Sequence, residues 1–177
     1  GKKREAPAFF NKDGKIYVTG AESIGMFTSA TSTSDIYNYG IIDVGNNKSY
    51  AIISNGSGKI YNYGSISLSA EGAVAFYIGD KSDIIEHGTI SAEANNTIGY
   101  SVGGTNTVSQ IPDVTFSDAQ AEATFTYYDV FGNLTISISG ENTIGSGTFA
   151  IAENGGKIIN NSNFKTGVDG SVLFKGL

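Results

Sequence analysis

Aromatic side chains recur at two positions of a repeated segment, and they are the first candidates for binding chemistry. The segments Ile36–Gly40 and Ile60–Gly64 both read Ile-Tyr-Asn-Tyr-Gly, and Ile84–Gly88 reads Ile-Ile-Glu-His-Gly, each 24 residues after the last. Such an array could stack on sugar rings or contact a protein partner. The alternative is that neighbouring strands simply favour aromatic pairs. The candidate binding residues of this array are Tyr37, Tyr39, Tyr61, Tyr63 and His87.

A polar residue lies between the two aromatic positions of each segment. Asn38, Asn62 and Glu86 hold this position, and looser copies of the segment place Gln110 and Asn160 there. Inward polar side chains at equivalent turns can hydrogen-bond to one another, which predicts a structural amide ladder. The alternative is that Glu86 acts as a general acid, but no second carboxylate shares its column.

Other features of the sequence argue against an enzyme or a metal protein. His87 is the single histidine, and the chain contains no cysteine. The phosphate-binding pattern G-x-x-x-x-G-K-[ST] and the zinc pattern H-E-x-x-H do not occur. We therefore expect no catalytic residue, no metal site and no cofactor.

The residues around these segments predict the strands that must position them. Apolar side chains recur in columns at the same spacing, and polar residues such as Asp43, Ser67 and Ser91 alternate with them. Alternation with period two is typical of strands with one buried face. The predicted columns are Ile42, Ile66, Ile90, Val114 and Phe164; Val44, Leu68, Ala92 and Phe116; Tyr50, Val74 and Ile98; and Ile52, Phe76 and Tyr100.

These columns predict an all-β fold, a right-handed parallel β-helix with about 24 residues and three short strands per coil. The chain of 177 residues holds about seven such coils and forms one segment, 1–177. A single coil has too few apolar groups to offset its loss of chain entropy. Stacking solves this, because each inward side chain then contacts the coils above and below.

The register is lost over residues 117–132, where the sequence contains extra residues. This stretch is either a lengthened coil or a loop that leaves the rod. Tyr127 and Tyr128 lie in it, and we add both to the candidate binding residues.

Composition limits the partners. The net charge is −6, which disfavours nucleic acid. The cluster Lys2-Lys3-Arg4 is interpreted as a solvated terminus. No apolar run is long enough to span a bilayer, and Gly1–Phe10 lacks the apolar region of a signal peptide. For an exported protein this favours a fragment of a longer chain.

Two stretches resemble a known family. Gly58–Ser69 reads Gly-Lys-Ile-Tyr-Asn-Tyr-Gly-Ser-Ile-Ser-Leu-Ser, and Gly155–Asn161 reads Gly-Gly-Lys-Ile-Ile-Asn-Asn. Both resemble passenger repeats of autotransporter adhesins, which belong to type V secretion, and the resemblance covers 14–116 and 133–177. It implies a rod on the outer surface of Gram-negative bacteria, exported through a C-terminal barrel that this chain lacks. The Gly-Asp-Ser-Gly motif of protease members does not occur.

The expected function is therefore a non-enzymatic adhesin segment that binds a host or bacterial surface protein or glycan. The side wall of the rod or the stretch 117–132 would make the contact. One alternative is a structural spacer or self-association stalk, which the apolar stretch Val172–Leu177 favours. A more remote alternative is a polysaccharide-processing enzyme.

Overall fold

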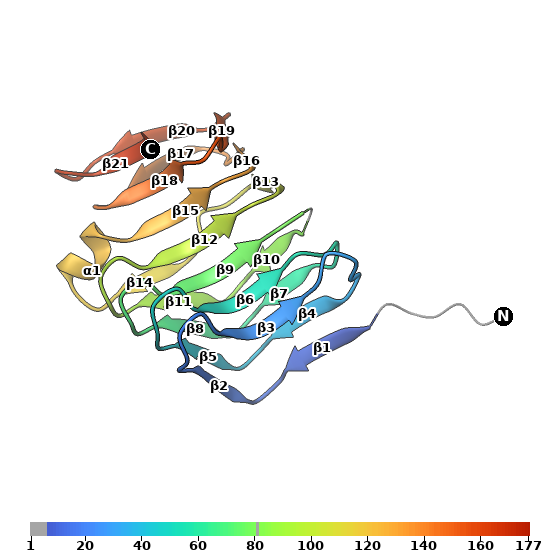
Figure 1. Cartoon of the computed structure of the whole chain (residues 1–177). Helices are drawn as coiled ribbons and strands as arrows, with labels where there is room; N and C mark the ends of the chain where they lie inside the picture. The colour runs from blue at the N-terminus through green and yellow to red at the C-terminus, as the bar shows by residue number, and fades with distance from the viewer. Residues whose placement is uncertain (1–6, 81) are drawn as a thin grey trace.

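A computed structural model describes residues 7–80 and 82–177, and it confirms the predicted parallel β-solenoid. About seven turns stack along one axis, about 24 residues apart, and 3% of the residues are helical (Figure 1). Each turn contributes three strands, and all the strand pairs are parallel. The basic cluster Lys2-Lys3-Arg4 lies outside the described residues.

The first four turns have three faces. The first face holds β1 (Ala8–Asn11), β4 (Asp35–Asn38), β7 (Ile60–Asn62) and β10 (Ile84–Glu86). The second holds β2 (Lys15–Val18), β5 (Ile41–Val44), β8 (Ser65–Leu68), β11 (Thr89–Ala92) and β14 (Val114–Phe116). The third runs through all the turns: β3 (Ile24–Thr28), β6 (Tyr50–Ser54), β9 (Val74–Ile78), β12 (Ile98–Val102), β15 (Thr126–Val130), β18 (Thr148–Ala152) and β21 (Val172–Gly176).

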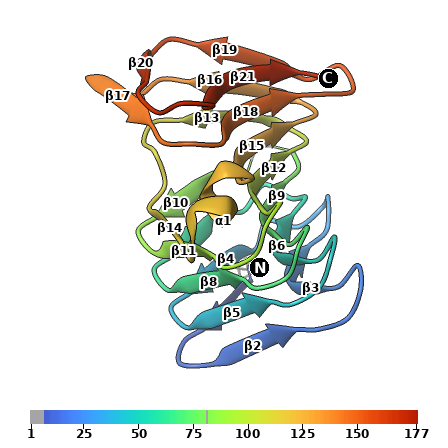
Figure 2. The same ribbon diagram turned by 90° about the vertical axis from the view of Figure 1, so that its left-hand side faces the viewer.

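The first and second faces are interrupted, whereas the third is continuous. β13 (Thr105–Val108), β16 (Asn133–Ile136) and β19 (Lys157–Asn160) form a separate sheet, and so do β17 (Glu141–Ile144) and β20 (Asn163–Thr166). Figure 2 shows this upper group of strands set apart from β10 and β14. Among the described strands, β10 therefore pairs with β7 and has no partner on its other edge.

Three of the four predicted apolar columns form the core of the first four turns. The column Tyr50, Val74 and Ile98 pairs in register as predicted, but Tyr50 and Ile98 are only half-buried and lie outside the core. Ile42 pairs with Ile66, Ile66 with Ile90, and Ile90 with Val114, and the three isoleucines are fully buried. Burial of apolar surface is the main favourable contribution to folding, and in-register stacking removes both sides of each residue from water. Phe164 was wrongly assigned to this column, because β20 pairs it with Asn142 of β17.

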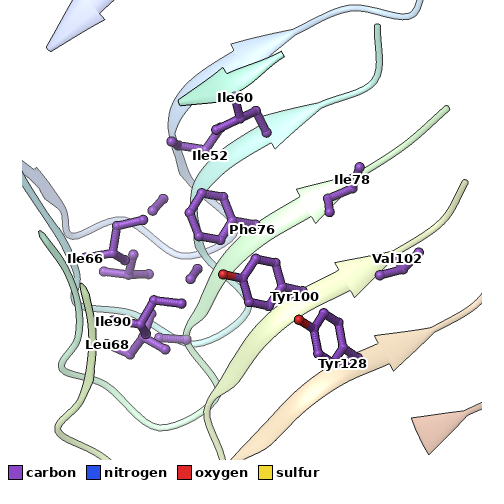
Figure 3. Close-up of a cluster of buried hydrophobic side chains, with 14 of the residues drawn as sticks. Ile52, Ile60, Ile66, Leu68, Phe76, Ile78, Ile90, Tyr100, Val102 and Tyr128 are labelled. Atoms are coloured by element: carbon purple, nitrogen blue, oxygen red, sulfur yellow. The ribbon is translucent and has the colours of Figure 1, made fainter. Parts of the chain in front are cut away.

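An aromatic stack lines the inner side of the third face. Phe76, Tyr100 and Tyr128 lie one above the other on β9, β12 and β15 (Figure 3). Ring centroids are 5.1 Å apart for Phe76 and Tyr100 and 5.0 Å apart for Tyr100 and Tyr128. These offset-stacked rings fill the interior at the level where the first face is interrupted.

A change in corner length causes the interruption. In the fourth turn five residues separate Ile78 of β9 from Ile84 of β10, but in the fifth only Gly103 and Gly104 separate β12 from β13. β13 therefore starts early and is displaced relative to β10. A Cβ at residue 104 would overlap the carbonyl oxygens of Gly79 and Asp80, so this short corner requires glycine.

The stretch 117–132 is a lengthened coil that stays within the rod. Its extra residues form the short helix α1 (Ala119–Ala123), capped by Asp118, whose carboxylate accepts a hydrogen bond from Ala121 N at 2.8 Å. The chain then continues into β15 and rejoins the third face. The helix accounts for the local spacing of 28 residues, as between Asn96 and Thr124.

We predict that Ile66→Ala lowers the free energy of unfolding by about 2–5 kcal/mol, because it opens a cavity in the middle of a stacked column. Urea unfolding followed by circular dichroism measures this. Ile159→Ala is the matched control, since Ile159 is 53% exposed and Ile66 is 0% exposed. Equal losses in the two variants would contradict the assigned inward column.

Candidate functional site

The outward side of the first face carries a continuous aromatic strip, defined here as Phe10, Tyr37, Tyr39, Tyr61, Tyr63 and His87. β4 and β7 position its centre, because inward Ile36, Asn38, Ile60 and Asn62 leave the alternate tyrosines pointing outward. The strip has two rows. In one, centroids are 4.5 Å apart for Phe10 and Tyr37 and 4.4 Å for Tyr37 and Tyr61. In the other they are 5.1 Å apart for Tyr39 and Tyr63 and 5.5 Å for Tyr63 and His87.

The rings of the strip stack on one another, so their faces are largely covered. The angle between the ring planes is 2° for Tyr37 and Tyr61 and 8° for Tyr39 and Tyr63. What each inner ring presents to solvent is therefore its edge and its hydroxyl. Tyr39 and Tyr63 are still 47% and 43% exposed, so the strip is accessible along its length.

His87 lies at one end of the strip and has no metal partners nearby. In the part of the chain that the structure describes, no three histidine or acidic side chains gather closely enough to hold a metal ion. The imidazole instead packs on the ring of Tyr63.

Tyr127 and Tyr128 do not belong to the exposed aromatic surface. Tyr128 is 3% exposed because β15 turns its side chain into the core, where it stacks on Tyr100. Tyr127 is half-buried and packs against Phe125 and Phe149. The prediction that Tyr128 is available for partner binding at the rod surface was wrong.

Behind the strip, an inward ladder of hydrogen bonds runs up the first face. Asn11 Nδ2 donates to Asn38 Oδ1 (3.0 Å), Asn38 Nδ2 to Asn62 Oδ1 (2.9 Å), and Asn62 Nδ2 to Glu86 Oε1 (2.9 Å). Sequence reasoning missed Asn11 because it lies 27 residues, not 24, before Asn38. The structure thus brings Asn38, Asn62 and Glu86 together as the sequence pattern indicated.

Gln110 and Asn160 lie elsewhere. Gln110 is exposed, and its Nε2 donates to the backbone carbonyl of Glu86 at 2.9 Å, capping the free edge of β10. Asn160 does not join the ladder, because β19 pairs it with Ile136 and its exposed side chain bonds to Ser162. The displacement of β13, which starts the new sheet, is the physical reason for both corrections.

Glu86 ends the ladder in a buried, well-bonded position. Its carboxylate also accepts from Gly88 N (3.0 Å) and from the Tyr100 hydroxyl (3.4 Å). Desolvation outweighs these hydrogen bonds and raises the pKa of Glu86 to about 7. The group can therefore gain or lose a proton near neutral pH while remaining attached to its neighbours.

A cavity of about 400 Å³ opens through the wall between β10 and β13, and we call it the wall cavity. Its lining includes Glu86 of β10 on the first face, and Tyr100 and Tyr128 on the third face. The separate sheet of β13 and β16 contributes Asn106 and Leu134. Nothing in the sequence pattern signalled this cavity except Gly103-Gly104, which sets the short corner beside it.

Comparison with known proteins does not assign this chain to a family. No protein-family model, curated protein or solved structure matches the chain. The resemblance to autotransporter passenger repeats therefore stays a hypothesis based on the repeat pattern. The described residues contain no helix long and apolar enough to cross a membrane.

We predict that Glu86→Gln removes part of the pH dependence of stability. The folded-state pKa is raised from 4.5 to about 7, so this carboxyl stabilises the fold below about pH 4.5, and its contribution is lost as pH rises through about 7. The wild-type free energy of unfolding should fall by about 2–3 kcal/mol more than that of the variant between about pH 5 and about pH 8.

Urea unfolding at the two pH values measures this difference, and other carboxyl groups cancel in the comparison. Glu93→Gln, at an exposed carboxyl, is the control and should keep the wild-type pH dependence. If Glu86→Gln also keeps the wild-type pH dependence of stability, the assignment of a raised pKa to Glu86 is wrong.

Proposed function

We propose that this chain is a non-enzymatic segment of a surface adhesin, part of an autotransporter passenger exposed on the outer surface of a Gram-negative bacterium. The observation that carries the proposal is the accessible aromatic strip, which runs over successive turns of the first face. Exposed aromatic surface of this extent is typical of an interaction site. The repeat pattern Gly58–Ser69 supports the assignment to the passenger family.

The partner class that fits the strip is a protein on a host or bacterial cell. Sugars stack on exposed ring faces, but the inner rings here cover one another. The free edges and hydroxyls suit a protein surface, where tyrosine contributes both apolar contact and hydrogen bonds. The strip is also held rigidly by the strands beneath it, so binding costs little conformational entropy.

The non-enzymatic assignment rests on how the acidic groups are used. Glu86 is the acidic residue nearest to the interior, and its two oxygens accept hydrogen bonds from Asn62, Gly88 and Tyr100. Glycoside hydrolysis, the remote alternative, requires two carboxyl groups on either side of one bond. Asp129 and Glu153 form a carboxyl pair, but they interact directly with each other, which leaves no room for a glycosidic bond between them. The strip itself contains aromatic rings and no carboxylate.

We predict that Tyr39→Ser with Tyr63→Ser reduces attachment to target cells at least about tenfold, because tyrosine side chains at an interface centre typically contribute more than 1 kcal/mol each. Beads coated with the purified chain are counted on intact epithelial cells and on intact bacteria. Parallel samples use cells pretreated with protease or with glycosidase, and protease should abolish attachment.

The matched control replaces two aromatic residues on other faces that are at least as exposed, Tyr17→Ser with Phe27→Ser, and should attach like the wild type. Circular dichroism confirms that both variants stay folded. Unchanged attachment of the strip variant would favour the structural spacer instead, and sensitivity to glycosidase but not to protease would overturn the choice of a protein partner.

A further inference from the structure

The wall cavity connects the surface of the rod with its interior. The outer edge of β10 has no ladder partner among the described strands, so its backbone N–H and C=O groups face the opening. Behind it, the stacked rings of Tyr100 and Tyr128 form the floor, and Val102 and Leu134 add apolar surface. A volume of about 400 Å³ lies within the range of about 300–1,000 Å³ seen for small-molecule sites.

One polar group in the cavity lacks the partner that a buried position demands. Asn106 is 7% exposed, and its Nδ2 donates to the backbone carbonyl of Ser82 at 2.6 Å. That hydrogen bond fixes which end of the amide is nitrogen, and it leaves Oδ1 with no hydrogen-bond partner in the described residues. Buried polar atoms are bonded in nearly all native structures, so Oδ1 indicates an occupant that donates a hydrogen bond.

A second polar group faces the same space. The Tyr100 hydroxyl is engaged by Glu86 at 3.4 Å, whereas that of Tyr128 makes no hydrogen bond within the described part of the chain. Figure 3 shows both hydroxyls pointing the same way from the third face. The cavity thus combines an unused acceptor, Asn106 Oδ1, with an unused donor, the Tyr128 hydroxyl.

We propose that the wall cavity binds one sugar ring, either a free monosaccharide or the terminal residue of a glycan. A sugar hydroxyl both donates and accepts, so neighbouring hydroxyls of one ring can bond to Asn106 and to Tyr128 together. The C–H surface of the ring packs against Val102 and Leu134. This site adjoins the aromatic strip at His87, which belongs to both, and adds a second binding activity to the proposed adhesin.

Two other occupants fit less well. An added peptide strand would need the free carbonyl of Glu86, but Gln110 Nε2 already donates to that oxygen at 2.9 Å. Water could satisfy Asn106 Oδ1, but it would leave the apolar wall from Val102 to Leu134 in contact with solvent.

The test is a titration of the isotope-labelled chain, followed by NMR. The probes are glucose, galactose, mannose and N-acetylglucosamine, free and as terminal units of short oligosaccharides, with a valine-threonine tetrapeptide as the peptide probe. We expect at least one sugar to shift the Asn106 side-chain amide and the backbone amides of Ile84–His87 and Thr105–Val108. Comparing the free sugars with the same sugars at the end of an oligosaccharide shows whether the cavity binds a free monosaccharide or the terminal residue of a glycan.

Variants identify the polar partners. Tyr128→Phe removes one hydroxyl and keeps the stacked ring, and it should weaken sugar binding at least about fivefold. Asn106→Leu should also weaken sugar binding at least about fivefold. If Asn106→Leu does not fold, Tyr128→Phe alone still tests the proposal. Tyr50→Phe, a half-buried hydroxyl outside the cavity, should bind like the wild type.

Three results would overturn the proposal. The first is that no sugar shifts the cavity resonances, which would mean that the cavity holds water. The others are that the tetrapeptide shifts these resonances and the sugars do not, or that Tyr128→Phe binds the sugar as tightly as the wild type. The strip variant with Tyr39→Ser and Tyr63→Ser should retain sugar binding in full. Loss of cell attachment and loss of sugar binding therefore report on the two proposed sites separately.

Discussion

The structure depends on one constraint, which is that each turn must stack in register on the turn before it. Parallel pairing places every residue beside its own equivalent, so a side chain meets a neighbour of nearly the same kind. Isoleucine then packs on isoleucine, asparagine bonds to asparagine and tyrosine stacks on tyrosine. The core, the amide ladder and the aromatic strip are three results of the same geometry.

This constraint also explains why a polar ladder is stable inside the rod. An amide carries donors and an acceptor, so a column of asparagines satisfies itself as long as the stacking continues. Asn38 and Asn62 are fully buried without an unpaired atom for this reason. The column ends at Glu86, where the first face is interrupted, and a carboxylate there can accept hydrogen bonds from below and from Tyr100 at the side.

The sequence predicted the fold well where the spacing stays constant. Columns such as Ile42–Ile66–Ile90–Val114 could be aligned without gaps, and the structure pairs them as expected. The prediction failed from Gln110 onward on the first face and after Phe116 on the second, because a two-residue corner at Gly103-Gly104 and the helix α1 change the phase of the repeat. The residues around Asn160 match the repeat in residue type, but β19 does not pair in the register that the repeat predicts. The wall cavity could not be predicted, since it arises from two strands that do not pair and from Asn106, which belongs to none of the predicted columns.

The interruption also has a mechanical consequence. At the junction of the fourth and fifth turns, hydrogen bonds between strands continue on the second and third faces but stop between β10 and β13 on the first. A rod joined along two of its three faces resists stretching there and bends most readily in the direction that opens the remaining face. Force applied to the end of this rod would therefore concentrate at the wall cavity, so an occupant that bridges its two rims would stiffen the junction against bending.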